Sequence, residues 1–219
     1  MIPAYGNVCR GILTEMSTSH AVAEFLPSSH GLHFANRFPP GPTIRVGLLD
    51  PRRFGFGDAS AGLCGGMCLF VRRRFEAGQA VPPLTEPPAN GSDLFRSVVR
   101  EQLRSLRVGL VPFRFWRMAA AAAPERERRT RDEEWPRIRA SLDDGRLTPI
   151  GLVRVTGRNP LRLVGNHQVL AYGYELDGDA IRLRIYDPNH PNRDDVTVPI
   201  APPGPQSTGE ALFGVVALD

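Results

Sequence analysis

Residues 61–71 read AGLCGGMCLFV, and the predicted fold and chemistry of this chain are best approached from them. Gly65 and Gly66 directly follow Cys64, and an apolar segment ending in three arginines comes next. Glycine costs about 1 kcal/mol relative to alanine in a helix interior, so a glycine pair favours a place where another molecule approaches the backbone closely. A cysteine in the first turn of a helix lies near the positive end of the helix dipole, which lowers the thiol pKa. The stretch therefore predicts a helix that begins near Cys64, with Cys64 as a candidate nucleophile.

The composition is that of a soluble globular protein. Of its residues, 42% are hydrophobic and 23% are charged, as is ordinary for such proteins. A length of 219 residues is enough for one sizeable core. No apolar run approaches the ~18 residues needed to cross a bilayer, so we expect no membrane partner. Residues 1–10 lack a basic region followed by an apolar block, which predicts no standard signal peptide. A cytoplasmic location is the default expectation, and signal-independent export stays open.

The charge pattern gives no sign of nucleic-acid binding. All 27 basic residues are arginine, and the net charge is +4. Arginines cluster at residues 72–74 and 126–131, but acidic residues are interleaved with the second cluster. Such mixing is typical of a solvated helix face, and no nucleic-acid motif accompanies either cluster. We therefore expect no nucleic-acid partner.

The three cysteines do not form a recognisable framework. Cys9, Cys64 and Cys68 cannot all pair, and their spacing is not that of a disulfide scaffold. Cys64 and Cys68 alone are too few ligands for zinc. We expect no metal and no cofactor, and a reducing compartment or a single reactive thiol accounts for the cysteines. Cys68, one helical turn after Cys64, is expected to be a core residue.

The predicted elements place helices first and strands second, as in α+β domains. Helical signals cover about 64–77, ended by Gly78, then 92–106 and 135–142; strand signals cover 148–155, 167–176, 180–186, 194–200 and 212–218. We expect one domain over residues 31–219, with a helical part over about 62–145 and a sheet part over about 148–219. Residues 1–30 are expected to be a flexible arm or a covering segment. Residues 31–41 are expected to be a packed loop.

A second candidate group of residues lies on the predicted hairpin. His167 begins one strand, Asp187 closes the partner strand, and the turn at residues 177–179 lies midway between them. Because a tight hairpin brings its two outer ends side by side, His167 and Asp187 are predicted to lie opposite each other. A carboxylate in that place accepts a hydrogen bond from the imidazole. Asn189 is the alternative orienting residue, whereas His190 is expected to be a surface loop residue.

In this order, Cys64 at a helix start, His167 opening a strand and Asp187 closing the next resemble the papain-like cysteine peptidase superfamily. The branch most similar is that of the bacteriocin-processing peptidases, and the resemblance covers about residues 62–218. It implies a papain-like fold in which a helical lobe carrying the cysteine packs on an antiparallel sheet carrying the histidine and the aspartate. It also implies that Cys64 attacks a carbonyl carbon, that His167 shuttles protons and that Asp187 fixes the imidazole tautomer.

One position departs from the family pattern. Such enzymes carry a glutamine about six residues before the cysteine that donates to the oxyanion, and here that position is Asp58. An ionised carboxylate there repels the developing negative charge. The backbone N–H of Cys64 can serve as one donor, and Ser60, Asn36 or Arg37 can supply the second. The sequence does not choose among these three.

Several functions are compatible with these residues. The leading expectation is a cysteine peptidase or amidase that hydrolyses a peptide or isopeptide bond of a peptide or protein substrate through a thioester. The first alternative is acyl transfer to an amine by the same residues, as in transglutaminase-like enzymes. The second, motivated by Asp58, is a papain-like domain that binds a partner without cutting it. A secreted effector or toxin is the third.

Overall fold

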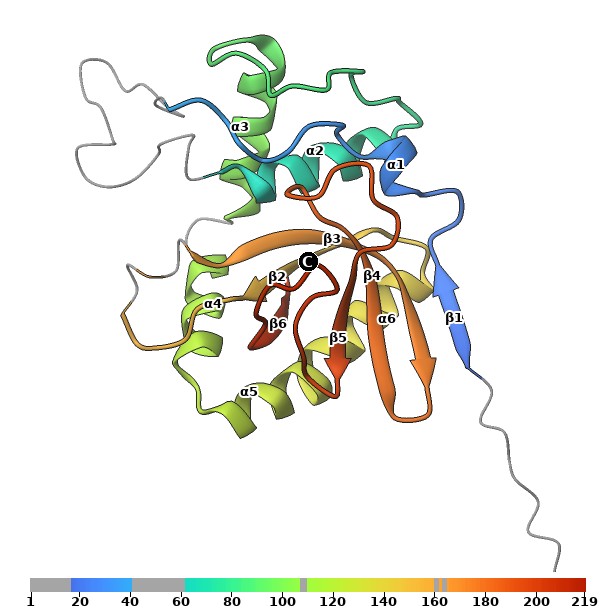
Figure 1. Cartoon of the computed structure of the whole chain (residues 1–219), viewed down its shortest axis with the longest axis vertical. Helices are drawn as coiled ribbons and strands as arrows, with labels where there is room; N and C mark the ends of the chain where they lie inside the picture. The colour runs from blue at the N-terminus through green and yellow to red at the C-terminus, as the bar shows by residue number, and fades with distance from the viewer. Residues whose placement is uncertain (1–16, 41–61, 107–109, 160–161, 163–164) are drawn as a thin grey trace, which may run out of the picture.

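The computed structural model contains a six-stranded antiparallel sheet with helices around it (Figure 1). The strands are β1 (Thr18–Ala21), β2 (Thr148–Val153), β3 (His167–Asp177), β4 (Ala180–Tyr186), β5 (Thr197–Ala201) and β6 (Gly214–Ala217). The helices are α1 (Pro27–His30), α2 (Cys64–Glu76), α3 (Asp93–Ser105), α4 (Leu110–Ala120), α5 (Ala123–Arg129), the π-helical turn η4 (Thr130–Glu134) and α6 (Trp135–Asp143). The structure describes residues 17–40, 62–106, 110–159, 162 and 165–219. The mixture of helices and antiparallel sheet confirms the predicted α+β class.

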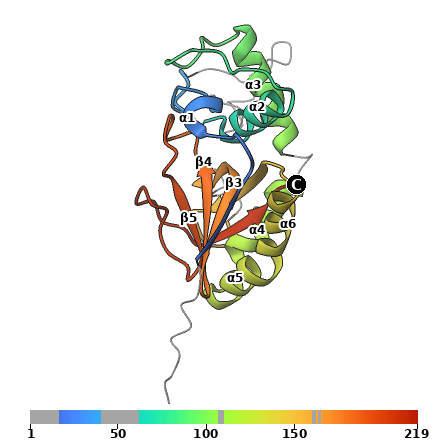
Figure 2. The same ribbon diagram turned by 90° about the vertical axis from the view of Figure 1, so that its right-hand side faces the viewer.

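The helices form two groups around the sheet. Figure 1 and Figure 2 show α2 and α3 together beyond one end of the strands, and α4, α5 and α6 against one face of the sheet. The sheet order is β5-β4-β3-β2-β6, and β1 also pairs with β3. The expected helical part is therefore divided between two places. α2 and α3 share the main core with the sheet, whereas α4 buries Phe115 and Met118 in a second cluster with Val153 and Val216 of the sheet. None of the described helices is long and apolar enough to cross a membrane.

The glycine pair at the start of α2 is explained by packing inside the chain. A Cβ on Gly66 would lie 2.3 Å from the backbone oxygen of Val98 in α3, and one on Gly65 would lie 2.4 Å from the side-chain oxygen of Gln168 in β3. These distances are far below any real contact of a Cβ atom. The approach to this backbone thus comes from α3 and β3, and not from another molecule as the sequence suggested. The glycines allow α2 to lie tightly between its neighbours.

β3 and β4 form the predicted hairpin, but not in the predicted register. A β-bulge shifts the ladder near its middle, so that Leu170 lies opposite Tyr186, where the ladder ends. The prediction that His167 and Asp187 are opposite each other in the ladder is therefore wrong. The register differs because the turn pairs Asp177 with Ala180, which centres the hairpin closer to Asp187 than to His167. The extra residue of the bulge in β3 offsets this difference by one position only. His167 pairs instead with β2, on the other side of β3.

The N-terminal part that the structure describes belongs to the fold. β1 pairs with β3, and Val22 and Phe25 are buried in the main core. Residues 18–25 therefore supply backbone hydrogen bonds and apolar surface to the fold, which does not fit the flexible arm among the two expectations for residues 1–30; the covering segment stays a prediction. Residues 31–40 form a packed loop, as predicted, with buried apolar side chains. Residues 1–16 of the first predicted segment and residue 41 at the end of the predicted loop lie outside the described residues.

The charged segment after α4 is a solvated helix face, as its mixed charges predicted. Glu125 pairs with Arg128 and Arg129 near the surface of α5. Thr130 and Glu134 are buried exceptions, and their side-chain oxygens accept hydrogen bonds from the backbone of β6. These two residues satisfy backbone donors that would otherwise be unpaired at the edge of the sheet.

Candidate active site

Cys64 is the first residue of α2 and stays partly exposed to solvent. The backbone N–H of Leu63, just before it, donates to Asn36 Oδ1 at 2.6 Å. The backbone N–H of Gly66 donates to Gln102 Oε1 at 2.7 Å. Both bonds satisfy donors that the first turn of a helix leaves open, and they tie the helix start to two other segments. The thiol therefore sits at the positive end of an anchored helix.

His167 and Asp187 form a buried hydrogen-bonded pair. His167 is the first residue of β3, and Asp187 directly follows β4. The imidazole Nε2 lies 2.7 Å from Asp187 Oδ1, and the two residues are 5% and 1% exposed. The side chains thus meet beyond the end of the ladder that connects their strands. This contact brings together two of the three residues that the sequence proposed.

Cys64 and His167 lie close enough for each to shift the pKa of the other. Burial alone would raise the pKa of the Cys64 thiol, but His167 and the backbone N–H groups of Gln168 and Gly65 bring this pKa below its ordinary value. Burial alone would lower the pKa of His167, but Cys64 and Asp187 raise it to about 9. Because Asp187 occupies Nε2, Nδ1 is the ring nitrogen left for the sulfur. These shifts favour a thiolate paired with an imidazolium at neutral pH.

The Asp187 carboxylate is held at both oxygens. Oδ1 also accepts from the backbone N–H of Asn189 at 2.8 Å, while Oδ2 accepts from Gln206 Nε2 at 2.8 Å and lies 3.6 Å from the guanidinium of Arg154. Burial would raise the pKa of Asp187, but the hydrogen bonds, first of all that of His167, lower it to about 2. Asp187 is therefore ionised across the neutral range. Asn189, the alternative orienting residue, contributes its backbone to Asp187, whereas Asp187 itself contacts the imidazole.

The structure brings one candidate for the second oxyanion donor to the start of α2. Asn36 uses its Oδ1 for the Leu63 N–H, which leaves its amide nitrogen beside the same turn. The backbone N–H of Asn36 donates to the segment that follows Asp187. Asp58 and Ser60 lie outside the described residues.

The remaining cysteine and histidines in the described parts have structural surroundings. Cys68 is fully buried, and burial raises the pKa of its thiol well above the ordinary value. His20 bonds to a backbone carbonyl of α6, and His30 accepts from the backbone within its own turn. His33 and His190 bond to side chains of neighbouring loops. Among the described residues, no group of three or more His, Cys, Asp and Glu side chains is arranged to hold a metal ion.

Two residues of this site, Gln206 and Arg154, were not indicated by the sequence. Gln206 lies in the proline-rich segment between β5 and β6, and Arg154 directly follows β2. Arg154 falls at the end of the strand predicted over residues 148–155, and Gln206 belongs to no periodic pattern; the chain contains many other polar residues in similar places. Only burial distinguishes Gln206, which is 2% exposed, and burial of a loop residue is not visible in the sequence.

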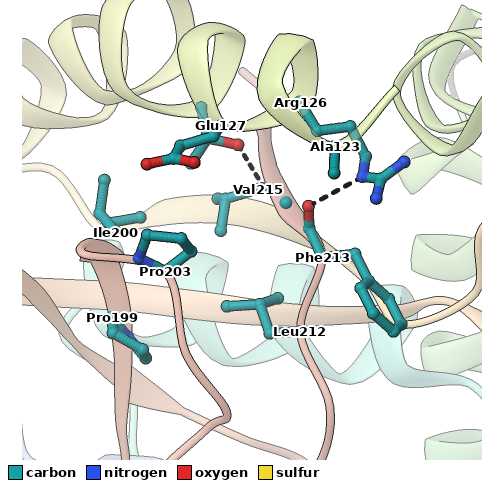
Figure 3. Close-up of a pocket in the computed structure, with 11 residues that line it drawn as sticks. Ala123, Arg126, Glu127, Pro199, Ile200, Pro203, Leu212, Phe213 and Val215 are labelled. Atoms are coloured by element: carbon teal, nitrogen blue, oxygen red, sulfur yellow. Dashed lines mark hydrogen bonds between the residues drawn. The ribbon is translucent and has the colours of Figure 1, made fainter. Parts of the chain in front are cut away.

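A separate cavity of about 170 Å³ lies between α5 and the segments around β5 and β6 (Figure 3). Its lining is mostly apolar, and Figure 3 shows Arg126 at its edge with its Nε donating to the backbone oxygen of Phe213 at 3.2 Å. None of Cys64, His167 and Asp187 lines it. The candidate active site is therefore at the start of α2, away from this cavity.

Comparisons with known proteins do not assign the chain to a family. No protein-family model matches the chain, and no curated protein and no solved structure shows significant similarity to it. The functional conclusion depends on the geometry and charges of the site.

Proposed function

We propose that this chain is a papain-like cysteine hydrolase that cleaves a peptide or isopeptide bond with Cys64 as the nucleophile. The observations that carry the proposal are the 2.7 Å contact between His167 Nε2 and Asp187 Oδ1 and the mutual pKa shifts of His167 and Cys64, which begins α2. The pKa values of the thiol and the imidazole are displaced in opposite directions, and both displacements favour the reactive ion pair. Groups perturbed in this way by defined partners are concentrated at catalytic sites.

The chemistry follows from these protonation states. The Cys64 thiolate attacks the carbonyl carbon, and a tetrahedral oxyanion forms as the carbonyl π bond breaks. His167 gives its Nδ1 proton to the leaving amine as the carbon–nitrogen bond breaks, which leaves a thioester on Cys64. His167 then takes a proton from water, the hydroxide attacks the thioester, and the carboxylic acid leaves as the thiolate and imidazolium form again. Asp187 holds the ring throughout, so that Nδ1 faces the sulfur.

The oxyanion needs donors aimed at the carbonyl oxygen. The backbone N–H of Cys64 belongs to the first turn of α2, where backbone donors point away from the helix. The amide nitrogen of Asn36 lies beside the same turn. We assign these two groups as the oxyanion donors. The amide of Asn36 takes the place of the glutamine in the family pattern.

Labelling of Cys64 is the first test, because it needs no known substrate. Iodoacetamide should alkylate Cys64 rapidly at neutral pH, with a rate that stays high below the pH at which ordinary thiols react. His167→Ala should remove this low-pH reactivity, while Cys68→Ala serves as the matched control and should keep it. If Cys64 reacts only as an ordinary thiol does, the chain is not a cysteine hydrolase of this kind.

Hydrolysis itself is tested with a library of fluorogenic peptides. Cys64→Ala should abolish turnover of any peptide that the wild-type protein cleaves, and Cys68→Ala should retain it. Adding a primary amine distinguishes the two enzymatic alternatives, because hydrolysis releases a free acid whereas acyl transfer releases a new amide. Unchanged turnover in Cys64→Ala would contradict the assignment of the nucleophile.

A further inference from the structure

The side chain of Gln206 is buried against Asp187 with all of its hydrogen-bonding groups in use. Its Nε2 donates to Asp187 Oδ2 at 2.8 Å and to Thr208 Oγ1 at 2.7 Å. Its Oε1 accepts from Arg154 Nη2 at 2.8 Å. The opposite amide orientation would place an oxygen against the carboxylate and an NH₂ group against the guanidinium. Gln206 can therefore occupy this place in one orientation only.

The backbone around Gln206 is fixed by its own loop. The N–H of Gln206 donates to the carbonyl of Glu210, and its carbonyl accepts from the N–H of Gly209. Ser207 is bonded to the start of β5 in both directions, through its backbone N–H and through its hydroxyl. The loop thus presents the amide at a fixed distance from Asp187. Such preorganisation is what distinguishes a positioning group from an incidental contact.

Gln206 also separates two opposite charges. Arg154 Nη2 lies 3.6 Å from Asp187 Oδ2, which is longer than a hydrogen bond, and the amide of Gln206 bridges the two groups. The charge of Arg154 therefore acts on Asp187 without occupying Oδ1, the oxygen that His167 uses. The charge of Asp187 acts in turn on the buried Cys68 and Tyr186, and both are neutral near pH 7 because burial, first of all, raises the pKa of each.

We propose that Gln206 and Arg154 are positioning residues that hold the Asp187 carboxylate in the orientation in which Oδ1 meets the His167 imidazole. This inference depends on the proposed function, because it concerns the same site. Without the amide, Oδ2 loses its donor, and the carboxylate can turn away from the ring. The ion pair of the Cys64 thiolate and the His167 imidazolium is then stabilised less.

The test compares Gln206→Met with Ser207→Ala, its neighbour in the same loop. Both variants lose hydrogen bonds in the loop, but only Gln206→Met removes a donor from Asp187. One hydrogen bond to a charged group corresponds to roughly 1 to 2 pH units in the pKa of Asp187, which should rise by that amount in Gln206→Met. Because the imidazolium is then held less well beside the thiolate, the acid limb of Cys64 alkylation by iodoacetamide should also move to higher pH, and Ser207→Ala should leave the limb unchanged. For a cleaved peptide, kcat should fall about 10- to 100-fold at constant KM.

A spectroscopic readout covers the case in which Gln206→Met does not fold. In the wild-type protein, the side-chain amide resonances of Gln206 should titrate with Asp187, and the Nε2 proton of His167 should appear at low field. Arg154→Met should broaden that proton resonance, Arg154→Lys should restore it, and Arg146→Met at an exposed ion pair is the matched control.

The outcomes separate the two proposals. If wild-type Cys64 shows no reactivity at low pH, the proposed function is wrong, and the positioning role that depends on it is wrong as well. If wild-type reactivity is as expected but Gln206→Met and Arg154→Met leave the acid limb and the imidazole proton unchanged, only the positioning role is wrong.

Discussion

His167 Nε2 lies 2.7 Å from Asp187 Oδ1, although the β3–β4 ladder does not pair these two residues. The ladder ends at Tyr186, one residue before Asp187, and the β-bulge has already shifted β4 along β3. The contact is made by side chains beyond the last ladder pair, and it is held by donors from two further segments. The orientation of the imidazole therefore depends on tertiary contacts more than on strand register.

Replacing Asp187 with asparagine tests the importance of its charge. The amide keeps the shape of the side chain but removes the negative charge, so the pKa of His167 should fall from about 9 toward its ordinary value. We expect kcat for peptide cleavage to fall by up to about 10⁴-fold, with little change in KM. Steady-state kinetics and an NMR titration of His167 measure both effects. Asp195→Asn, at an exposed ion pair, should change neither.

The pH profile of catalysis should have a wide plateau. The thiolate–imidazolium pair exists between the lowered pKa of Cys64 and the raised pKa of His167. Activity should therefore persist through neutral pH and fall as the pH rises through about 9, where the imidazolium loses its proton. The measurement is kcat/KM against pH in buffers of constant ionic strength. A basic limb near pH 6.5 would show that the imidazolium is not stabilised.

The folding stability should depend on pH through His167 and Asp187. The pKa of His167 is raised on folding to about 9, so its stabilising contribution is full below about 6.5 and is lost as the pH rises through about 9. The pKa of Asp187 is lowered to about 2, so its contribution is present above about 4 and is lost as the pH falls through about 2. Urea unfolding between pH 2 and 10 measures both limbs. In His167→Ala the basic limb should disappear.

Gly66→Ala should destabilise the fold at the contact between α2 and α3. The added methyl group would lie 2.3 Å from the backbone oxygen of Val98, and backbone cannot move aside as a flexible side chain can. We expect a loss of about 1 to 3 kcal/mol in the free energy of unfolding, measured with urea. Gly204→Ala is the control, because its added methyl group finds only ordinary contact, at 3.5 Å. Equal stability of the two variants would contradict the packing argument for the glycine pair.

Asn36→Ala tests the second oxyanion donor. Loss of one such donor typically reduces kcat by about 100- to 1000-fold, and we expect this loss without an equal loss of Cys64 alkylation. Asn90→Ala, which removes an exposed asparagine bonded to two backbone carbonyls, is the control. If alkylation falls as much as kcat, Asn36 acts by holding the start of α2 and not on the oxyanion.

Much of the local structure could be predicted from the sequence. Ser92 caps α3 through a hydrogen bond to the N–H of Phe95, as its residue type and place indicated. The alternation at residues 180–186 gave the bounds of β4, and Gly78 indicated where α2 ends. These features depend on neighbours within a few residues, so composition and spacing contain the information.

The sequence alone determined the α+β class, the candidate nucleophile and the choice of His167 and Asp187, because each depends on local pattern and residue chemistry. Tertiary structure decided how these residues meet. It placed β1 on β3, set the hairpin register through the turn and a bulge, and brought Gln206 and Asn36 to the site from distant loops. Contacts of this kind depend on which surfaces pack together over the whole chain. The spacing of residues close together in the sequence contains no information about such contacts.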